Sequence, residues 1–171
     1  IANGYVTPTR CAEGLAVSAM RKTDPVFDIG CGTGLSAQAL KALGFTCIDG
    51  TDLSPDMLAL AEETGLYRQL YLGDLETPLN AGAGDYINMT AVGVFSPGHA
   101  PATLIDVVIN RLPPGGCFVF SLNDHALADA SYEAAIDRII TTGQAQRVIA
   151  TYGPHLPAQN LRAQVCVLRR L

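Results

Sequence analysis

The chain has 171 residues, of which 49% are hydrophobic and 16% are charged, and its formal net charge at pH 7 is −5. This length is typical of one domain, and the composition excludes a disordered segment or a coiled coil and favours a layered domain with a large core. Nucleic-acid binding needs a basic face, and the sequence has no Lys/Arg run beyond Arg169-Arg170. We therefore expect a small-molecule substrate and no nucleic-acid partner.

The cysteines and the apolar stretches bear on the location of the protein. The five cysteines form no CxxC pair, so we expect small buried hydrophobic residues in a reducing compartment rather than metal ligands. No apolar stretch reaches the roughly 18 residues of a membrane span, and no signal peptide is visible. We expect a cytoplasmic protein with no membrane partner and no metal, and the sequence leaves open whether it is a monomer or a dimer.

Apolar periodicity and helix-end signals divide the chain into alternating elements. A first helix is expected from Thr7-Pro8 to about Lys22, because Thr is a good cap and Pro fits the first turn. The expected strands are 26–29, 45–50, 66–72, 85–91, 117–122, 146–152 and 163–169. The expected later helices are 35–43, 55–64, 100–111 and 128–140.

This order of elements predicts the fold class. Alternating strands and helices imply parallel strands with crossover helices on both faces, and two closing strands without a helix between them imply an antiparallel hairpin. We expect an α/β, Rossmann-like, doubly wound seven-stranded sheet that is mostly parallel, with an antiparallel C-terminal edge strand. Residues 1–171 are expected to form a single domain, and because the chain starts at Ile1 we expect the native protein to extend beyond it.

A glycine-rich loop, Asp28-Ile29-Gly30-Cys31-Gly32-Thr33-Gly34, follows the first predicted strand. Ligands of open α/β sheets bind at the carboxyl ends of strands, and glycines let the backbone approach a ligand closely. Asp28 is a poor neighbour for a pyrophosphate but a natural partner for the α-ammonium group of S-adenosylmethionine. Leu35 also stands where a dinucleotide fingerprint has its final Gly or Ala. The loop therefore favours S-adenosylmethionine as the cofactor.

Two further acidic residues follow the next two predicted strands. Asp52 is placed to accept hydrogen bonds from a ribose diol, which by itself fits NAD, FAD and S-adenosylmethionine equally. Asp74, in Gly73-Asp74-Leu75, is placed to receive an adenine amino group.

In this order and spacing, the motifs of residues 26 to 122 resemble those of class I S-adenosylmethionine-dependent methyltransferases. They are the glycine loop, Asp52-Leu53-Ser54-Pro55-Asp56-Met57-Leu58, Gly73-Asp74-Leu75 and Leu112-Pro113-Pro114-Gly115-Gly116. Three more segments are similar to the Williams–Beuren syndrome region methyltransferase-like proteins. These segments are Gly4-Tyr5-Val6-Thr7-Pro8, Val92-Gly93-Val94-Phe95 with His99-Ala100-Pro101, and Phe118-Val119-Phe120-Ser121-Leu122-Asn123.

The resemblance implies an enzyme of type EC 2.1.1.- that yields S-adenosylhomocysteine, and it implies cofactor roles for the matching residues. Asp28 would face the amino group through the loop, and Gly30, Cys31 and Gly32 would back the methionine. Asp52 would bind ribose, and Leu53 or Met57 would flank the adenine. Asp74 and Leu75 would meet the adenine edge, and Thr90 would lie near the sulfonium. Members of the superfamily often carry an N-terminal cap with aromatic residues, which we expect before Ile1. Asn88-Met89-Thr90-Ala91 lacks a D/N-P-P-Y-type motif, which argues against DNA adenine methylation.

The catalytic residue is not identified by the sequence. His99 and His125 follow predicted strands on the cofactor side and are candidates for a base or a substrate contact; the alternatives are an exposed loop histidine and a polar turn. Asn123 and Tyr5 are further candidates for substrate binding, against the alternatives of a helix cap and a surface aromatic. A protein that senses S-adenosylmethionine without turnover, and less plausibly a nicotinamide-dependent oxidoreductase, are the competing functions.

Overall fold

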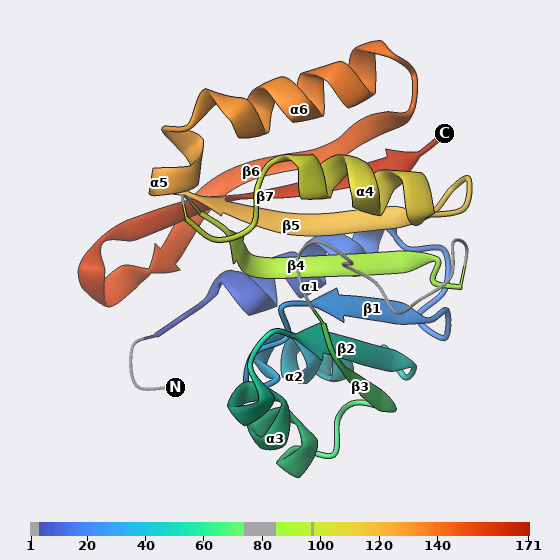
Figure 1. Ribbon diagram of the computed structural model, residues 1–171, viewed down its shortest axis with the longest axis vertical. Coiled ribbons are helices and arrows are strands. Elements are labelled where there is room, and N and C mark those ends of the chain that lie inside the picture. The colour runs from blue at the N-terminus through green and yellow to red at the C-terminus, as the bar shows by residue number, and fades with distance from the viewer. Residues whose placement is uncertain (1–3, 74–84, 97) are drawn as a thin grey trace.

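The computed structural model describes residues 4–73, 85–96 and 98–171. A seven-stranded sheet with the order β3-β2-β1-β4-β5-β7-β6 forms its centre (Figure 1). The strands are β1 (Val26–Ile29), β2 (Ile48–Asp52), β3 (Gln69–Leu72), β4 (Asn88–Phe95), β5 (Cys117–Asn123), β6 (Ala145–Leu156) and β7 (Leu161–Arg170). The first five run parallel, and β7 is antiparallel to both β5 and β6. The predicted fold class is confirmed.

One detail of that prediction differs, which is the position of the C-terminal strand. β7 lies between β5 and β6 and is hydrogen-bonded on both sides, so β6 is the edge strand. The physical reason lies in burial: the run Val165 to Leu168 is buried on both faces of the sheet, whereas most β6 side chains reach solvent. A continuously apolar strand is stable inside a sheet and unfavourable at its edge.

Helices cover both faces of the sheet (Figure 1). They are α1 (Thr7–Ser18), α2 (Leu35–Ala42), α3 (Pro55–Glu63), α4 (Thr103–Arg111), α5 (Asp124–Leu127) and α6 (Ala130–Thr141), with a short 3-10 turn η1 (Pro157–Gln159). Leu15 of α1 and Leu40 of α2 pack on one face with Val26, Val119 and Val167. The apolar residues of α4 and α6 pack on the other face with a cluster of aromatic side chains. The helices α4 and α6 each bury an apolar stripe, as their sequence periods predict, whereas α3 buries only Ala61.

Several element boundaries differ from the sequence-based expectation. α1 ends at Ser18, because Ala19 is extended and its N–H closes the last turn on the Leu15 carbonyl. The expected helix 128–140 is preceded by α5, whose cap is the Asn123 side chain. β4 continues past residue 91 to Phe95 through a shift of register. That shift includes Gly93, whose backbone has a φ of +74°.

The expected burial of the cysteines is confirmed for four of the five. All five are free, and four of them are buried, while Cys47 is half-buried. Within the described ranges, no helix is long and apolar enough to cross a membrane.

Candidate functional site

The glycine loop wraps over the carboxyl ends of β1 and β2. The Cys31 N–H donates to the Thr51 carbonyl over 2.9 Å, and the Gly34 N–H donates to the Cys31 carbonyl over 3.0 Å. Gly30 and Gly32 both have positive φ, +65° and +54°. A Cβ on Gly30 would lie 2.6 Å from Val94 Cγ2, whereas a Cβ on Gly32 would meet no described atom within 4 Å. Gly30 is therefore required for packing, and Gly32 faces open space.

Asp28 lies beneath this loop and not in it. Its side chain is fully buried, and three hydroxyl groups donate to its carboxylate. Thr90 and Tyr67 donate over 2.7 Å each, and Ser36 of α2 donates to the same oxygen as Tyr67. Burial raises the pKa of Asp28, and the three hydrogen bonds oppose that rise. Asp28 thus ties β1, β4, α2 and the segment before β3 together.

The sequence predicts ligand contacts for Asp28 and Thr90, near the amino group and the sulfonium respectively. In the structure both side chains are buried, and the Thr90 hydroxyl donates to Asp28 because β1 and β4 pair these two residues directly. The two residues therefore support the loop from below, and their contacts with a ligand stay predictions.

Asp52 is the last residue of β2 and stands at the front of the loop. Its Oδ2 accepts from the Gly32 N–H over 2.8 Å, and its Oδ1 accepts from the Ser54 N–H over 2.9 Å. The carboxylate is therefore fixed by two backbone amides and also borders an open cavity. A fixed carboxylate of this kind binds hydroxyl donors strongly.

Two cavities flank the loop, and Gly30 lines both of them. The Asp52 cavity has a volume of about 300 Å³, and the Tyr5 cavity has a volume of about 220 Å³. The first is lined by Ile29, Gly30, Thr51, Asp52, Leu53, Gly73, Gly93, Val94, Gly98, His99 and Ala100. The second is lined by Tyr5, Pro8, Gly30, Cys31, Gly32, Thr33, Leu35, Ser36, Met57 and Val92. Together they form a site at the carboxyl ends of the parallel strands, where α/β sheets bind ligands.

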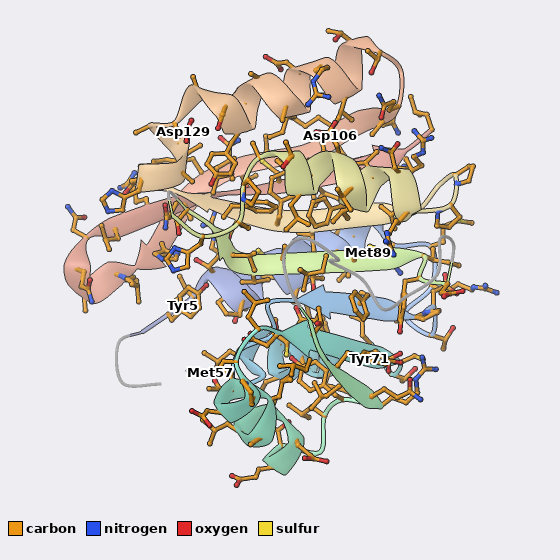
Figure 2. The ribbon with its side chains drawn as sticks, in the orientation of Figure 1. Tyr5, Met57, Tyr71, Met89, Asp106 and Asp129 are labelled. Carbon is orange, nitrogen blue, oxygen red and sulfur yellow. The ribbon has the colours of Figure 1, made fainter. Side chains whose placement is uncertain are left out.

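Most of the residues predicted for the site line one of these cavities. Leu53, which is 51% exposed, and His99 border the Asp52 cavity. Tyr5, Cys31 and Met57 border the Tyr5 cavity (Figure 2), in which Tyr5 and Met57 lie at the edge where β1 ends.

Four other predicted residues remain to be placed. Asp74 and Leu75 lie outside the described residues. Asn123 uses its side chain to cap α5, accepting from the Ala126 N–H over 2.9 Å. His125 is an exposed residue of that same short helix and lines neither of the two cavities in the described part of the chain. The structure thus shows the helix-cap role that is the alternative for Asn123, and a substrate contact of this residue stays a prediction.

The charge state of the groups around the loop limits its chemistry. Burial, followed by the nearby Asp28 and Asp52 carboxylates, raises the pKa of the Cys31 thiol to about 12. Cys31 therefore stays protonated at neutral pH and is a poor nucleophile. Among the residues that the structure describes, no cluster of His, Cys, Asp and Glu is placed to hold a metal ion.

Sequence reasoning missed several residues of the site. Gly93, Val94 and Ala100 line the Asp52 cavity. A glycine inside an apolar strand such as Val92-Gly93-Val94 is a signal for a bulge or a close backbone approach, and it marks this position. Tyr67 and Ser36, which hold Asp28, carry no such local signal.

Comparison with known proteins agrees with this geometry. Residues 27–120 match the family described as "Methyltransferase domain". Human methyltransferase-like protein 27 is 35% identical over 129 residues, which are 73% of this chain and 52% of that protein. The chain thus spans about half the length of this curated relative.

Solved structures share the fold. Magnesium protoporphyrin IX methyltransferase from Synechocystis PCC 6803, solved with bound SAM, has a TM-score of 0.71 at 17% identity, covering 97% of this chain and 81% of that one. Ribosomal protein L11 methylase from Lactobacillus delbrueckii subsp. bulgaricus has a TM-score of 0.70 at 21% identity, with coverages of 98% and 80%. The 1,6-didemethyltoxoflavin-N1-methyltransferase of Burkholderia thailandensis has a TM-score of 0.71 at 17% identity, with coverages of 98% and 79%.

The resemblance inferred from the motifs is confirmed, and the chain belongs to the methyltransferase domain family.

Proposed function

We propose that this chain binds S-adenosylmethionine along the glycine loop and transfers its methyl group to a small-molecule acceptor, leaving S-adenosylhomocysteine. The observation that carries the proposal is the pair of cavities that share Gly30 in their lining, one bordered by Asp52 and the other by Gly32 and Tyr5. A long ligand with a nucleoside at one end and an amino acid at the other fits such a divided site.

The residues of the two cavities suit the two halves of this cofactor. In the Asp52 cavity, the fixed carboxylate of Asp52 would accept hydrogen bonds from ribose hydroxyls, with Leu53 beside the base. In the Tyr5 cavity, the backbone of Gly30 to Gly32 would back the methionine part. Leu35 and Ser36, in the first turn of α2, also border this cavity, and a helix N-terminus favours a carboxylate.

Bound S-adenosylmethionine supplies a methyl group already activated on a sulfonium, so the chain has mainly to align an acceptor and exclude water. His99 borders the Asp52 cavity and is our candidate for the acceptor side. Its Nδ1 lies 2.9 Å from the Ser96 hydroxyl, which orients the ring. In the tautomer in which Nδ1 donates to Ser96, Nε2 is the basic nitrogen. An acceptor that holds a proton at working pH would lose it to His99.

The size and charge of the chain support a small acceptor. The cavities of about 300 and 220 Å³ have room for the cofactor and a modest substrate, and the net charge of −5 is unfavourable for a nucleic acid. We also propose that residues 1–171 act as one domain, since a single sheet runs from Val26 to Arg170.

Calorimetry with S-adenosylmethionine, S-adenosylhomocysteine and NAD, each added to the same protein preparation, tests the cofactor. We expect binding of the first two, and tight NAD binding without S-adenosylmethionine binding would overturn the proposal. Turnover to S-adenosylhomocysteine in the presence of a metabolite pool tests the activity. Binding without turnover across many acceptors would favour a sensor.

A further inference from the structure

The N-terminal segment, residues 4–10, connects the cofactor site to the distant β6–β7 hairpin. Tyr5 of this segment lines the Tyr5 cavity. Its hydroxyl reaches the β4 bulge, since a Cβ on Gly93 would lie 2.6 Å from it. Figure 2 shows Tyr5 at the edge of the sheet where Met57 also lies. The residues that fix the position of Tyr5 therefore affect the geometry of the Tyr5 cavity.

His155, near the end of β6, is the residue against which Tyr5 packs. The two rings meet edge to face, with centroids 5.0 Å apart and an interplanar angle of 78°. The Nδ1 of His155 lies 2.8 Å from the Thr7 hydroxyl, and its carbonyl accepts from the Val6 N–H over 3.1 Å. Three consecutive residues of the N-terminal segment thus contact this one histidine, which is only 9% exposed.

Arg10 adds a second attachment between the same two parts. Its guanidinium donates to the carbonyls of Thr151 and Pro154 on β6 and of Ala163 on β7, over 2.8 to 2.9 Å. These bonds fix the start of α1 on the hairpin and leave the placement of the Tyr5 ring to His155.

We propose that His155 is a positioning residue for the cofactor site: in its neutral form it holds Tyr5 against the glycine loop and β4, and so couples the β6–β7 hairpin to cofactor binding. This inference rests on the proposed function. It assigns His155 no contact with cofactor or substrate, and its effect is carried by Tyr5.

The charges around His155 favour the neutral form. Tyr5 and Thr7 face it from the N-terminal segment, Arg10 from α1 and Asp124 from α5. Burial lowers the pKa of His155, Asp124 opposes that change, and Arg10 reinforces it. If the segment were released, the pKa of His155 would return toward its ordinary value of 6.5, and His155 would gain a proton below that pH. With the segment packed against it, the lowered pKa keeps His155 neutral to a lower pH. The packed arrangement is therefore intact above pH 6.5 and weakens as the pH falls below it.

The test is a double-mutant cycle on S-adenosylhomocysteine affinity with Tyr5→Ala, His155→Ala and the double variant. We expect His155→Ala to weaken binding by about threefold to tenfold, and to have no further effect once Tyr5 is Ala. Equal effects in both backgrounds, or no effect in either, would overturn the inference. Gln146→Ala, an exposed position on the same strand, is the control for general damage to β6. A wild-type chain that fails to bind the ligand would instead refute the proposed function.

Two readouts separate positioning from a merely structural role. Without ligand, the Val6 amide should exchange faster with solvent in His155→Ala than in wild type, while the amides of β1 should not. His155→Asn keeps a polar atom near the Nδ1 position but does not titrate. Between pH 7.5 and 5.5 we expect affinity to fall at least about threefold more in wild type than in His155→Asn. Parallel pH profiles, or unchanged exchange at Val6, would count against the inference.

Discussion

Tyr67→Phe removes one of the three hydroxyl groups that donate to the buried Asp28 carboxylate, and it leaves the ring in place. A hydrogen bond to a charged acceptor contributes about 1.5–3 kcal/mol, and Tyr67 is only half-buried, so we expect a loss near the lower end of this range. For a chain of this size that corresponds to a fall in Tm of roughly 3–6 °C. Urea unfolding followed by circular dichroism, with calorimetry for Tm, measures both quantities.

Tyr71→Phe is the matched control, because the Tyr71 hydroxyl donates to the neutral Gln69 side chain at the surface. We expect it to cost less than about 0.5 kcal/mol. The pH dependence adds a second check. Burial raises the pKa of Asp28 above its ordinary value, so the folded chain binds this proton at a higher pH than the unfolded chain does. The Tyr67 hydrogen bond favours the ionised Asp28 carboxylate. The difference in the free energy of unfolding between Tyr67→Phe and wild type should therefore become smaller as the pH is lowered through the raised pKa of Asp28. Equal losses for Tyr67→Phe and Tyr71→Phe at every pH would refute the role given to Asp28.

Three further predictions concern ligand binding and turnover. Gly32→Val should abolish S-adenosylhomocysteine binding, measured by calorimetry, because the side chain fills the open space above the loop. The control is Gly143→Val, since Gly143 has a similar positive φ and similar open surroundings; it should strain the backbone in the same way but leave the affinity unchanged. Asp52→Ala should weaken binding by roughly tenfold to 150-fold, from about 1.5–3 kcal/mol of charge-assisted hydrogen bonding, and the exposed Asp56→Ala should leave it unchanged. His99→Gln should keep the affinity within about twofold but lower kcat by about a hundredfold or more with a proton-bearing acceptor, and an unchanged kcat in steady-state assays would remove His99 as the base.

The sequence predicts the fold because its signals are local and agree with one another. The glycine loop, the stops at Asp52 and Gly73, and the alternation of apolar runs place the strand ends that form the site. The positions of Asp52 and Leu53 in the site can therefore be predicted, because the carboxyl ends of parallel strands and the residues that follow them all lie at one edge of the sheet.

The parts that sequence reasoning could not supply depend on contacts between distant residues. Asp28 is separated from Ser36, Tyr67 and Thr90 by 8, 39 and 62 positions. Nothing local shows that three hydroxyls converge on one carboxylate, so the supporting role of the buried Asp28 could not be predicted from the sequence. The pairing of Tyr5 with His155 spans the chain in the same way, and only the packed structure brings the two rings together.

The insertion of β7 between β5 and β6 has a consequence for the order in which the chain folds. Until residues 161–170 have been synthesised and have paired with β5, β6 has no strand of the sheet to pair with. The edge of β5 that later pairs with β7 also stays open. Pairings of high sequence separation form slowly, and exposed apolar strands invite aggregation in the meantime. A nascent chain that stops short of β7 should therefore depend on chaperones until this strand has been made and has docked on β5.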